Sequence, residues 1–168
     1  MSKEHALVKK LTNKKYTITT AESCTGGLLS AAIVNVSGAS GVLNSAYVTY
    51  ANEAKESIVG VSHDTLDNFG AVSEETATEM CLGCARAANA DIGLSTTGIA
   101  GPDGGTAEKP VGLVYIGCSV CGKVTVKEFL FNGDRAKIRE NTVSAALNFM
   151  RECILKYYSE VTFGSSEK

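Results

Sequence analysis

The sequence predicts an α/β protein, a three-layer α/β/α sandwich around a mixed sheet. Segments with the apolar spacing of helices alternate with short, β-branched segments along most of the chain. Two of the expected strands lead into polar, glycine-rich loops, the arrangement in which open α/β sheets bind ligands. Towards the C-terminus two strands follow each other directly as a hairpin, so we expect antiparallel pairs beside the parallel ones.

Length and composition indicate one domain. The chain has 168 residues, of which 44% are hydrophobic and 20% charged, and this is enough for a full core. The sequence contains no repeat, low-complexity segment or internal linker. We therefore expect a single domain over residues 1–163, followed by a frayed tail over 164–168.

The first third of the chain predicts a helix, a strand and a second helix. Apolar residues have helical spacing in 4–12, and YTITTA at 16–21 is a short β-branched strand. A glycine-containing turn at 24–27 leads into the helix LLSAAIVNV. The segment VSGASG ends this helix because it is rich in glycine and serine.

The next segments predict a strand, a short helix and a turn. VLNSAYVTYA at 42–51 is expected as the second strand. After it, Asn52 can cap the short helix EAKESIVG, with Gly60 as its terminator. We interpret the following segment, SHDTLDNFG, as a turn.

The remaining elements complete the alternation. Ser73 begins an imperfect capping box with two glutamates in the first helical turn. The loop GIAGPDGGTAEKP separates two strands, and Cys121-Gly122 forms a hairpin turn. We expect a helix over 74–89, strands over 91–97, 111–120 and 124–131, and a long helix from Asp134 to about Tyr157.

Charge and hydropathy exclude several classes of partner. The net charge is −2 and the lysines form no basic run, so we expect no nucleic acid as a ligand. The longest apolar stretch, 27–36, is much shorter than the roughly 20 residues of a membrane span. The polar N-terminus MSKEHALVKKL lacks the apolar core of a signal peptide. We expect a cytoplasmic protein with no membrane partner.

Six cysteines raise the question of a metal or redox site. Cys81 with Cys84, and Cys118 with Cys121, form two CxxC pairs, a pattern of zinc sites. However, 33 residues separate the pairs, against roughly 15 to 20 in four-cysteine zinc signatures. The first pair also lies in an expected helix, where cysteine behaves as a small buried hydrophobe. We expect reduced thiols, no metal and no cofactor, with a cysteine-based zinc or redox module as the alternative.

The loops AESCTGG at 21–27 and TGIAGPDGG at 97–105 are the candidate ligand loops. The first precedes an expected helix, so helical N–H groups would surround Ser23 and suit a phosphate or a developing oxyanion. The helix N-terminus would also favour a thiolate at Cys24, a second candidate nucleophile, although a buried and inert thiol is the simpler interpretation. The simpler alternative is that Ser23 or Thr25 only caps the helix. The second loop has no Walker or dinucleotide pattern, but it can cradle a nucleotide phosphate or ribose.

A catalytic serine needs a base, and composition limits the choice. Only His5 and His63 are present, in a frayed start and a polar turn, so we do not expect a Ser-His-Asp triad. Lysine can replace histidine when burial or cationic neighbours lower its pKa. Lys55 and Tyr50, near the end of the second strand, are the candidates. Their simpler interpretations are a solvated helix residue and a half-buried strand aromatic.

Five ordered motifs extend over nearly the whole chain: TAESCTGG, GVLNSAYVTYANEAK, FGAVSEETA, TGIAGPDGG with KPVGLVYIG, and FNGDRAKIRENTVSAAL. Together they strongly resemble the competence-damage-inducible protein (CinA) family, specifically its C-terminal nicotinamide-nucleotide amidohydrolase domain. The resemblance implies the three-layer fold, homo-oligomerisation and deamidation of nicotinamide mononucleotide. Longer members carry an extra molybdopterin-binding-like N-terminal domain, for which 168 residues leave no room. We therefore expect the stand-alone amidohydrolase.

Carried over by motif, the resemblance implies Ser23 as the catalytic serine, with Tyr50 and Lys55 as its partners. Of the two arginines in GDRAKIR, four positions apart on a helix, one would hold the phosphate, and the choice stays open. A surface ion pair is the alternative for each. The expected substrate-binding residues are Thr25, Gly26, Gly27, Asn52, Thr97, Gly98, Ile99, Ala100, Gly101, and Arg135 or Arg139.

The expected reaction is carboxamide hydrolysis. Lys55 deprotonates Ser23, with Tyr50 relaying or stabilising, and N–H groups after the serine hold the oxyanion; attack by a water bound to Ser23 fits the same residues. A nonenzymatic nucleotide-binding module would share the site without turnover. A short-chain dehydrogenase does not fit, because Tyr50 and Lys55 do not have the Tyr-x-x-x-Lys spacing and the early glycine fingerprint is absent.

Overall fold

The computed structural model describes the backbone of residues 3–163 and the side chains of residues 4–157. None of the helices in this described part is both long and apolar enough to cross a membrane. The elements are α1 (Lys3–Lys14), β1 (Ile18–Glu22), α2 (Leu28–Val34), η1 (Ala39–Gly41), β2 (Leu43–Val48), α3 (Asn52–Val59), α4 (His63–Phe69), α5 (Glu74–Ala88), β3 (Ile92–Gly98), β4 (Leu113–Val120), β5 (Lys123–Leu130) and α6 (Arg135–Phe163).

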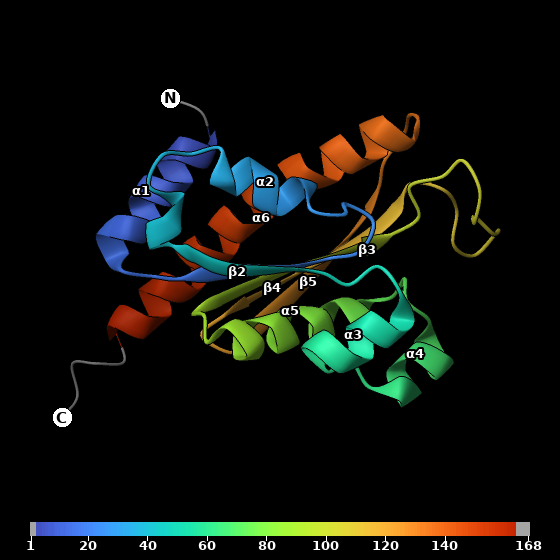
Figure 1. The fold of residues 1–168 in the computed structure, drawn as a ribbon, viewed down its shortest axis with the longest axis horizontal. Helices are drawn as coiled ribbons and strands as arrows, with labels where there is room; N and C mark the ends of the chain where they lie inside the picture. The colour runs from blue at the N-terminus through green and yellow to red at the C-terminus, as the bar shows by residue number, and fades with distance from the viewer. Residues whose placement is uncertain (1–2, 164–168) are drawn as a thin grey trace.

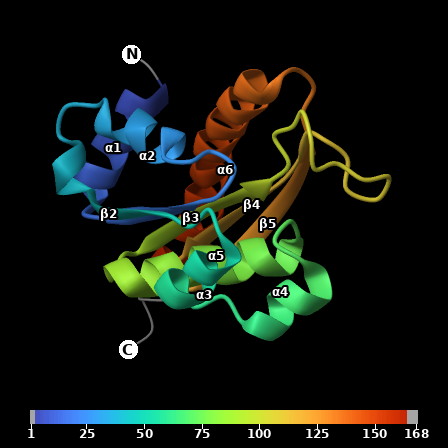
Figure 2. The ribbon, with the colours of Figure 1, turned by 45° about the vertical axis from the view of Figure 1, so that its right-hand side comes forward.

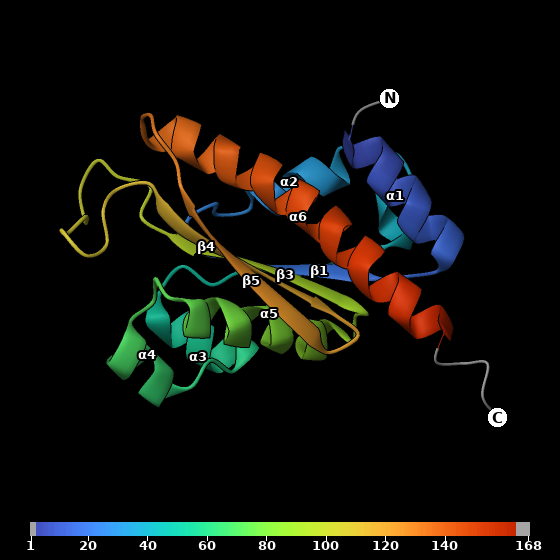
Figure 3. The ribbon, with the colours of Figure 1, turned by 180° about the vertical axis from the view of Figure 1, so that it is seen from behind.

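The five strands form one mixed sheet in the order β2-β1-β3-β4-β5. β1 pairs in parallel with β2 and β3, whereas β3, β4 and β5 pair antiparallel. Helices α1, α2 and α6 cover one face, and α3, α4 and α5 cover the other, as Figures 1 and 3 show from opposite sides. The predicted three-layer sandwich with a mixed sheet is confirmed.

Helix α5 lies unusually close to the centre of the sheet because two strand glycines face it. A Cβ atom on Gly93 of β3 would lie 2.0 Å from Cys81 O, and one on Gly117 of β4 would lie 2.6 Å from Ala77 O. Any larger residue would push the helix off the sheet. On the opposite face, larger apolar side chains of β3 and β4 pack against α1, α2 and α6.

The topology brings three loops to one end of the sheet. β1, β2 and β3 run in parallel, so their carboxyl ends lie at the same edge. In open α/β sheets this edge is where ligands bind. The first turn of α6 reaches the same end, next to the long loop that follows β3 (Figure 2). Residues 23–27, 49–51, 98–112 and 135 therefore meet there.

The prediction of a turn over 62–70 is wrong, because this segment contains helix α4. Ser62 is its N-cap and accepts a hydrogen bond from Thr65 N at 3.2 Å. Leu66 is buried in the smaller core cluster, beside residues of α3 and α5. One turn-like sequence thus becomes helical because a cap and a single apolar anchor secure it.

Several other element ends differ from those expected; β2, for example, ends at Val48 and not at 51. The predicted cap at Asn52 is wrong: Ala51 is the N-cap of α3, because the first helical bond runs from Lys55 N to Ala51 O, and Asn52 is already inside the helix. α6 begins at Arg135, one residue after the predicted start at Asp134, whose carboxylate accepts a hydrogen bond from Lys137 N at 2.8 Å, and the helix continues past its predicted end to Phe163.

Candidate active site

A cavity of about 190 Å³ lies at the carboxyl end of the parallel strands. It opens between the loop after β1, the end of β2, the loop after β3 and the start of α6. Its wall consists of Ser23, Cys24, Tyr50, Gly98, Ile99, Ala100, Gly101, Asp103, Gly104 and Arg135. Both glycine-rich loops predicted from the sequence thus contribute to a single concave site.

Lys55 is the most unusual side chain near this cavity, because only 1% of it is exposed. Its Nζ lies 3.2 Å from Ser23 Oγ, 3.0 Å from Thr49 O and 3.1 Å from Tyr50 O. Burial lowers the pKa of the Lys55 amine below its usual 10.5, because a charged amine loses its hydration there. The buried amine is therefore easier to deprotonate than a surface lysine.

The partners of Lys55 favour a specific orientation of the neutral amine. The Thr49 and Tyr50 carbonyl oxygens can only accept hydrogen bonds. A neutral amine has two N–H groups, which these two carbonyls can take, and its lone pair then faces the Ser23 hydroxyl. This is the geometry required of a general base acting on a serine.

Glu22 is a central residue that the sequence reasoning missed. It is fully buried, and its carboxylate accepts hydrogen bonds from the Thr20 and Thr25 hydroxyls and from the N–H groups of Gly27, Leu29 and Ser30. Five donors stabilise the buried negative charge. The only sequence signal for Glu22 was an acidic residue between a β-branched strand and a glycine turn. An exposed loop glutamate gives the same pattern, so this signal could not identify Glu22.

Glu22 also corrects the expectation for helix α2. The helix begins at Leu28, and the N–H groups at its start donate to Glu22 instead of surrounding Ser23. The N–H groups of Cys24 and Thr25 have no acceptor among the described residues. These two, and not the helical ones, are the amides left for an oxyanion.

Arg139 and Thr25 hold the serine loop in place from behind. Arg139 donates from Nε to Cys24 O at 3.0 Å and from Nη2 to Thr25 O at 2.8 Å. Thr25 is fully buried and bonded to Glu22 and to Thr96 Oγ1. Thr25 was expected to contact the nucleotide, and Arg139 was the alternative to Arg135 for the phosphate; neither is part of the cavity wall.

Arg135 is the arginine that lines the cavity. It is the first residue of α6, and it donates from Nη1 to Gly101 O at 2.9 Å and from Nη2 to the Tyr50 hydroxyl at 3.0 Å. The Tyr50 hydroxyl therefore contacts this arginine, and only the Tyr50 carbonyl contacts Lys55. The direct bond between the Tyr50 hydroxyl and Lys55 that a proton relay needs does not occur in this arrangement.

Several other predicted substrate-binding residues lie outside the cavity wall. Gly26 and Gly27 have φ values of +56° and +100°, which only glycine adopts without strain, and they shape the turn. Thr97 is fully buried and donates to Ala71 O. Asn52 is exposed on the first turn of α3. By contrast, the predicted segment 98–101 lies directly in the wall.

The Cys24 side chain is a buried thiol, which agrees with the simpler of the two interpretations of this residue and not with a reactive thiolate. It is 6% exposed, and burial raises its pKa to about 12. The Cys24 backbone N–H lowers this pKa and the negative charge of Glu22 raises it, but burial is the largest effect. Ser23 is therefore the nucleophile candidate of this loop.

The two CxxC pairs do not form a common site. Cys81 and Cys84 are buried in α5, Cys118 is buried in β4, and Cys121 is exposed at the hairpin turn. Within the described residues, no group of three or more His, Cys, Asp or Glu side chains is arranged to hold a metal ion.

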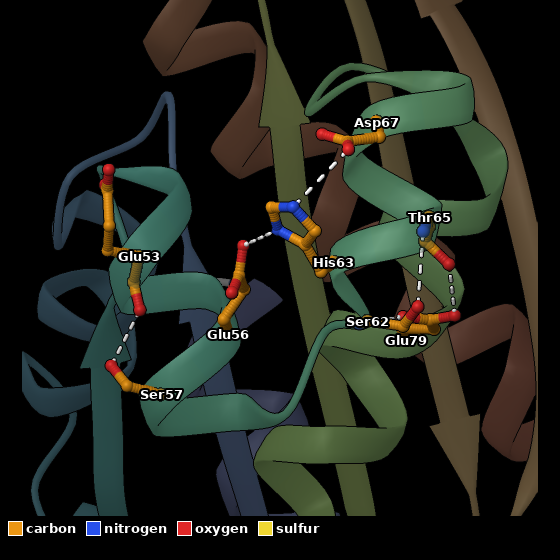
Figure 4. Close-up of polar contacts among 8 residues, drawn as sticks. All are labelled: Glu53, Glu56, Ser57, Ser62, His63, Thr65, Asp67 and Glu79. Atoms are coloured by element: carbon orange, nitrogen blue, oxygen red, sulfur yellow. Dashed lines mark hydrogen bonds and ion pairs between the residues drawn. The ribbon is translucent and has the colours of Figure 1, made fainter.

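His63 lies on the outer surface at the junction of α3 and α4 (Figure 4). Its Nδ1 is 3.0 Å from Glu56 Oε1, and its Nε2 is 3.4 Å from Asp67 Oδ2. The hydrogen bond to Glu56, followed by the charge of Asp67, raises the pKa of the imidazole. His63 is absent from the cavity wall, and this leaves Lys55 as the candidate base next to Ser23.

The motifs and the fold agree with a known family. The profile of the CinA C-terminal domain matches residues 1–154. The chain belongs to this family. It is 54% identical over 154 residues to a "CinA-like protein" of Kosmotoga olearia, a match that covers 92% of this chain. The chain spans only 37% of the length of the curated relatives that it matches first.

Solved structures of the family share the fold. The competence/damage inducible protein CihA from Agrobacterium tumefaciens has a TM-score of 0.84 and 38% identity, with 90% of this chain and 96% of that chain covered. A competence-damaged protein (CinA) superfamily protein from Klebsiella pneumoniae 700603 has a TM-score of 0.88 and 31% identity, with 92% and 96% covered.

Proposed function

We propose that the protein is a nicotinamide mononucleotide deamidase, which hydrolyses the carboxamide of nicotinamide ribonucleotide to nicotinate ribonucleotide and ammonia. The observation that carries this proposal is the contact between the buried Lys55 amine and Ser23 Oγ at 3.2 Å. A lowered pKa and two carbonyl partners prepare this amine to take the serine proton. The substrate follows from the resemblance to the amidohydrolase domain of the CinA family.

For each step of the proposed reaction, a group of the site is positioned to carry it out. Ser23 Oγ attacks the carboxamide carbon as its proton passes to Lys55 Nζ. The free N–H groups of Cys24 and Thr25 bind the oxyanion, and the Lys55 ammonium protonates the leaving nitrogen to give ammonia. Water, deprotonated by the same amine, then releases the nicotinate ribonucleotide. Direct attack by a water held on Ser23 uses the same groups and differs only in lacking the acyl-enzyme.

The cavity wall supplies the contacts for the remote part of the substrate. Arg135 binds the phosphate, since its guanidinium can exchange its neutral partners, Gly101 O and the Tyr50 hydroxyl, for a charged one. Backbone groups of 98–101 border the ribose. Glu22 and Arg139 keep the serine loop rigid while the substrate binds.

The chemistry requires neither metal nor cofactor, because a serine nucleophile, an amine base and backbone amides complete the reaction. We also propose, from the resemblance, that the protein works in the cytoplasm as a homo-oligomer in pyridine nucleotide salvage. Its partner is the small-molecule substrate, with no nucleic acid and no membrane.

Ammonia release tests the proposal. Purified protein should release one ammonia per nicotinamide mononucleotide, with a much lower kcat/KM for free nicotinamide because the phosphate supplies binding energy. Activity should survive exhaustive chelation. Binding without ammonia release would support a nonenzymatic nucleotide-binding module instead. About one equivalent of tightly bound zinc, with activity lost when the zinc is removed and restored when it is added back, would support a metal site instead.

A further inference from the structure

The cavity wall holds two opposite charges that do not pair with each other. Arg135 and Asp103 both line it, yet Arg135 bonds to Gly101 O and the Tyr50 hydroxyl. Within the described residues, Asp103 makes no hydrogen bond and no ion pair. A carboxylate and a guanidinium in one cavity of about 190 Å³ thus remain separated.

Asp103 is exposed in a loop whose backbone packs closely against Val111 on both sides of it. A Cβ atom on Gly101 would lie 2.5 Å from a methyl group of Val111, and one on Gly105 would lie 2.8 Å from Val111 N. The loop is also tied to β4, since Ile99 N donates to Leu113 O at 2.9 Å. The glycines on either side of Asp103 thus lie against Val111, while the Asp103 side chain is exposed at the cavity and, within the described residues, pairs with no other group.

Separated opposite charges suit a zwitterionic ligand. Nicotinamide mononucleotide is one, because its N-substituted pyridinium ring is positive and its phosphate is negative. We propose that Asp103 recognises the positive charge of the pyridinium ring while Arg135 holds the phosphate, so that the enzyme selects nicotinamides whose ring nitrogen is quaternary. This inference rests on the proposed function and names the feature of the substrate that the site selects.

A cationic ring and a neutral ring should bind differently because each changes the solvation of the Asp103 carboxylate. Binding any ligand removes water from the Asp103 carboxylate, and only a cationic ring compensates that loss. A neutral ring leaves the carboxylate desolvated and unpaired, so the site discriminates against it. The same contact does not depend on the carboxamide, and it therefore acts on binding independently of the chemistry at Ser23.

Binding to a Ser23→Ala parent protein tests this inference without turnover. Calorimetry compares nicotinamide mononucleotide with its 1,4-dihydro form, which keeps the ribose and phosphate but has a neutral ring. Asp103→Asn in this parent should weaken binding of the cationic nucleotide roughly tenfold, as expected for one partly screened charge contact. Binding of the dihydro form should change less than about twofold. Glu108→Gln, in the same loop but outside the cavity wall, is the matched control and should change neither.

Three results would overturn the inference. Equal weakening of both nucleotides by Asp103→Asn would assign Asp103 to the ribose hydroxyls or another shared group. Unchanged binding of both would remove it from recognition. In either case the proposed function would stand, provided that the unsubstituted protein releases ammonia. Failure of the parent to bind either nucleotide would overturn this inference, and it would overturn the proposed function as well if the unsubstituted protein also releases no ammonia.

Discussion

Replacement of the buried lysine separates catalysis from stability. Lys55→Met keeps the length of the side chain and removes the amine. Loss of a positioned proton acceptor should lower kcat by roughly two to four orders of magnitude. The Thr49 and Tyr50 carbonyls lose a donor, at about 1–3 kcal/mol for each buried group left unpaired. Removing an amine whose burial is unfavourable offsets part of this, so we expect the free energy of unfolding to fall by less than about 3 kcal/mol.

The pH dependence follows from the lowered pKa of Lys55. Only the neutral amine accepts a proton, so kcat/KM should rise with pH through this pKa and level off above it. Between the folded pKa and the usual 10.5, the unfolded chain binds one more proton than the native protein at this site. Stability should therefore rise with pH in this window, and the contribution should be absent in Lys55→Met.

Two measurements decide the matter: steady-state ammonia release across pH and urea unfolding of the same variants. Lys127→Met, an exposed lysine on β5 that forms an ion pair with Glu152, is the matched control and should keep its activity and pH profile. Near-normal turnover of Lys55→Met, or an unchanged pH profile, would refute the assignment of Lys55 as the base.

Three other substitutions test the surroundings of the serine. Glu22→Ala leaves three backbone N–H groups without their acceptor, so urea unfolding should show a loss of at least about 3 kcal/mol; a loss below 1 kcal/mol would contradict the role of its carboxylate. Arg135→Met should raise KM for the mononucleotide at least about tenfold and leave kcat/KM for free nicotinamide unchanged. Equal effects on both substrates would show that Arg135 does not bind the phosphate. Cys24→Ala should keep most of kcat, because its thiol has a pKa of about 12; an inactive variant that folds and binds substrate would make the thiol the nucleophile.

Local patterns were sufficient to predict the architecture. Alternating apolar periods and the hairpin at Cys121-Gly122 gave the mixed sheet, and the glycine-rich loops gave the end of the sheet where the cavity lies. Ser23 and Lys55 could be paired because only two histidines were available to compete with the lysine. The family resemblance named the same two residues, and the structure brings them into contact.

Contacts between distant segments could not be predicted in this way. Thr25 and Arg139 have the sequence context of ligand-binding residues, and only the fold shows that one meets Glu22 and the other the loop carbonyls. Glu22 itself resembles an ordinary loop glutamate until α2 is placed over it. Helix α4 was not predicted because its apolar residue, Leu66, stabilises the helix only when residues of α3 and α5 pack around it.

The most direct test of the serine–lysine amidohydrolase is to incubate nicotinamide mononucleotide with the unsubstituted protein and with Ser23→Ala. Ammonia and nicotinate ribonucleotide are then measured in the same samples. The account predicts equal amounts of both products from the unsubstituted protein. It also predicts a loss of at least two orders of magnitude in kcat for Ser23→Ala, about the worth of a key catalytic group, with nucleotide binding retained. Absence of ammonia from the unsubstituted protein, or undiminished turnover by Ser23→Ala, would contradict it.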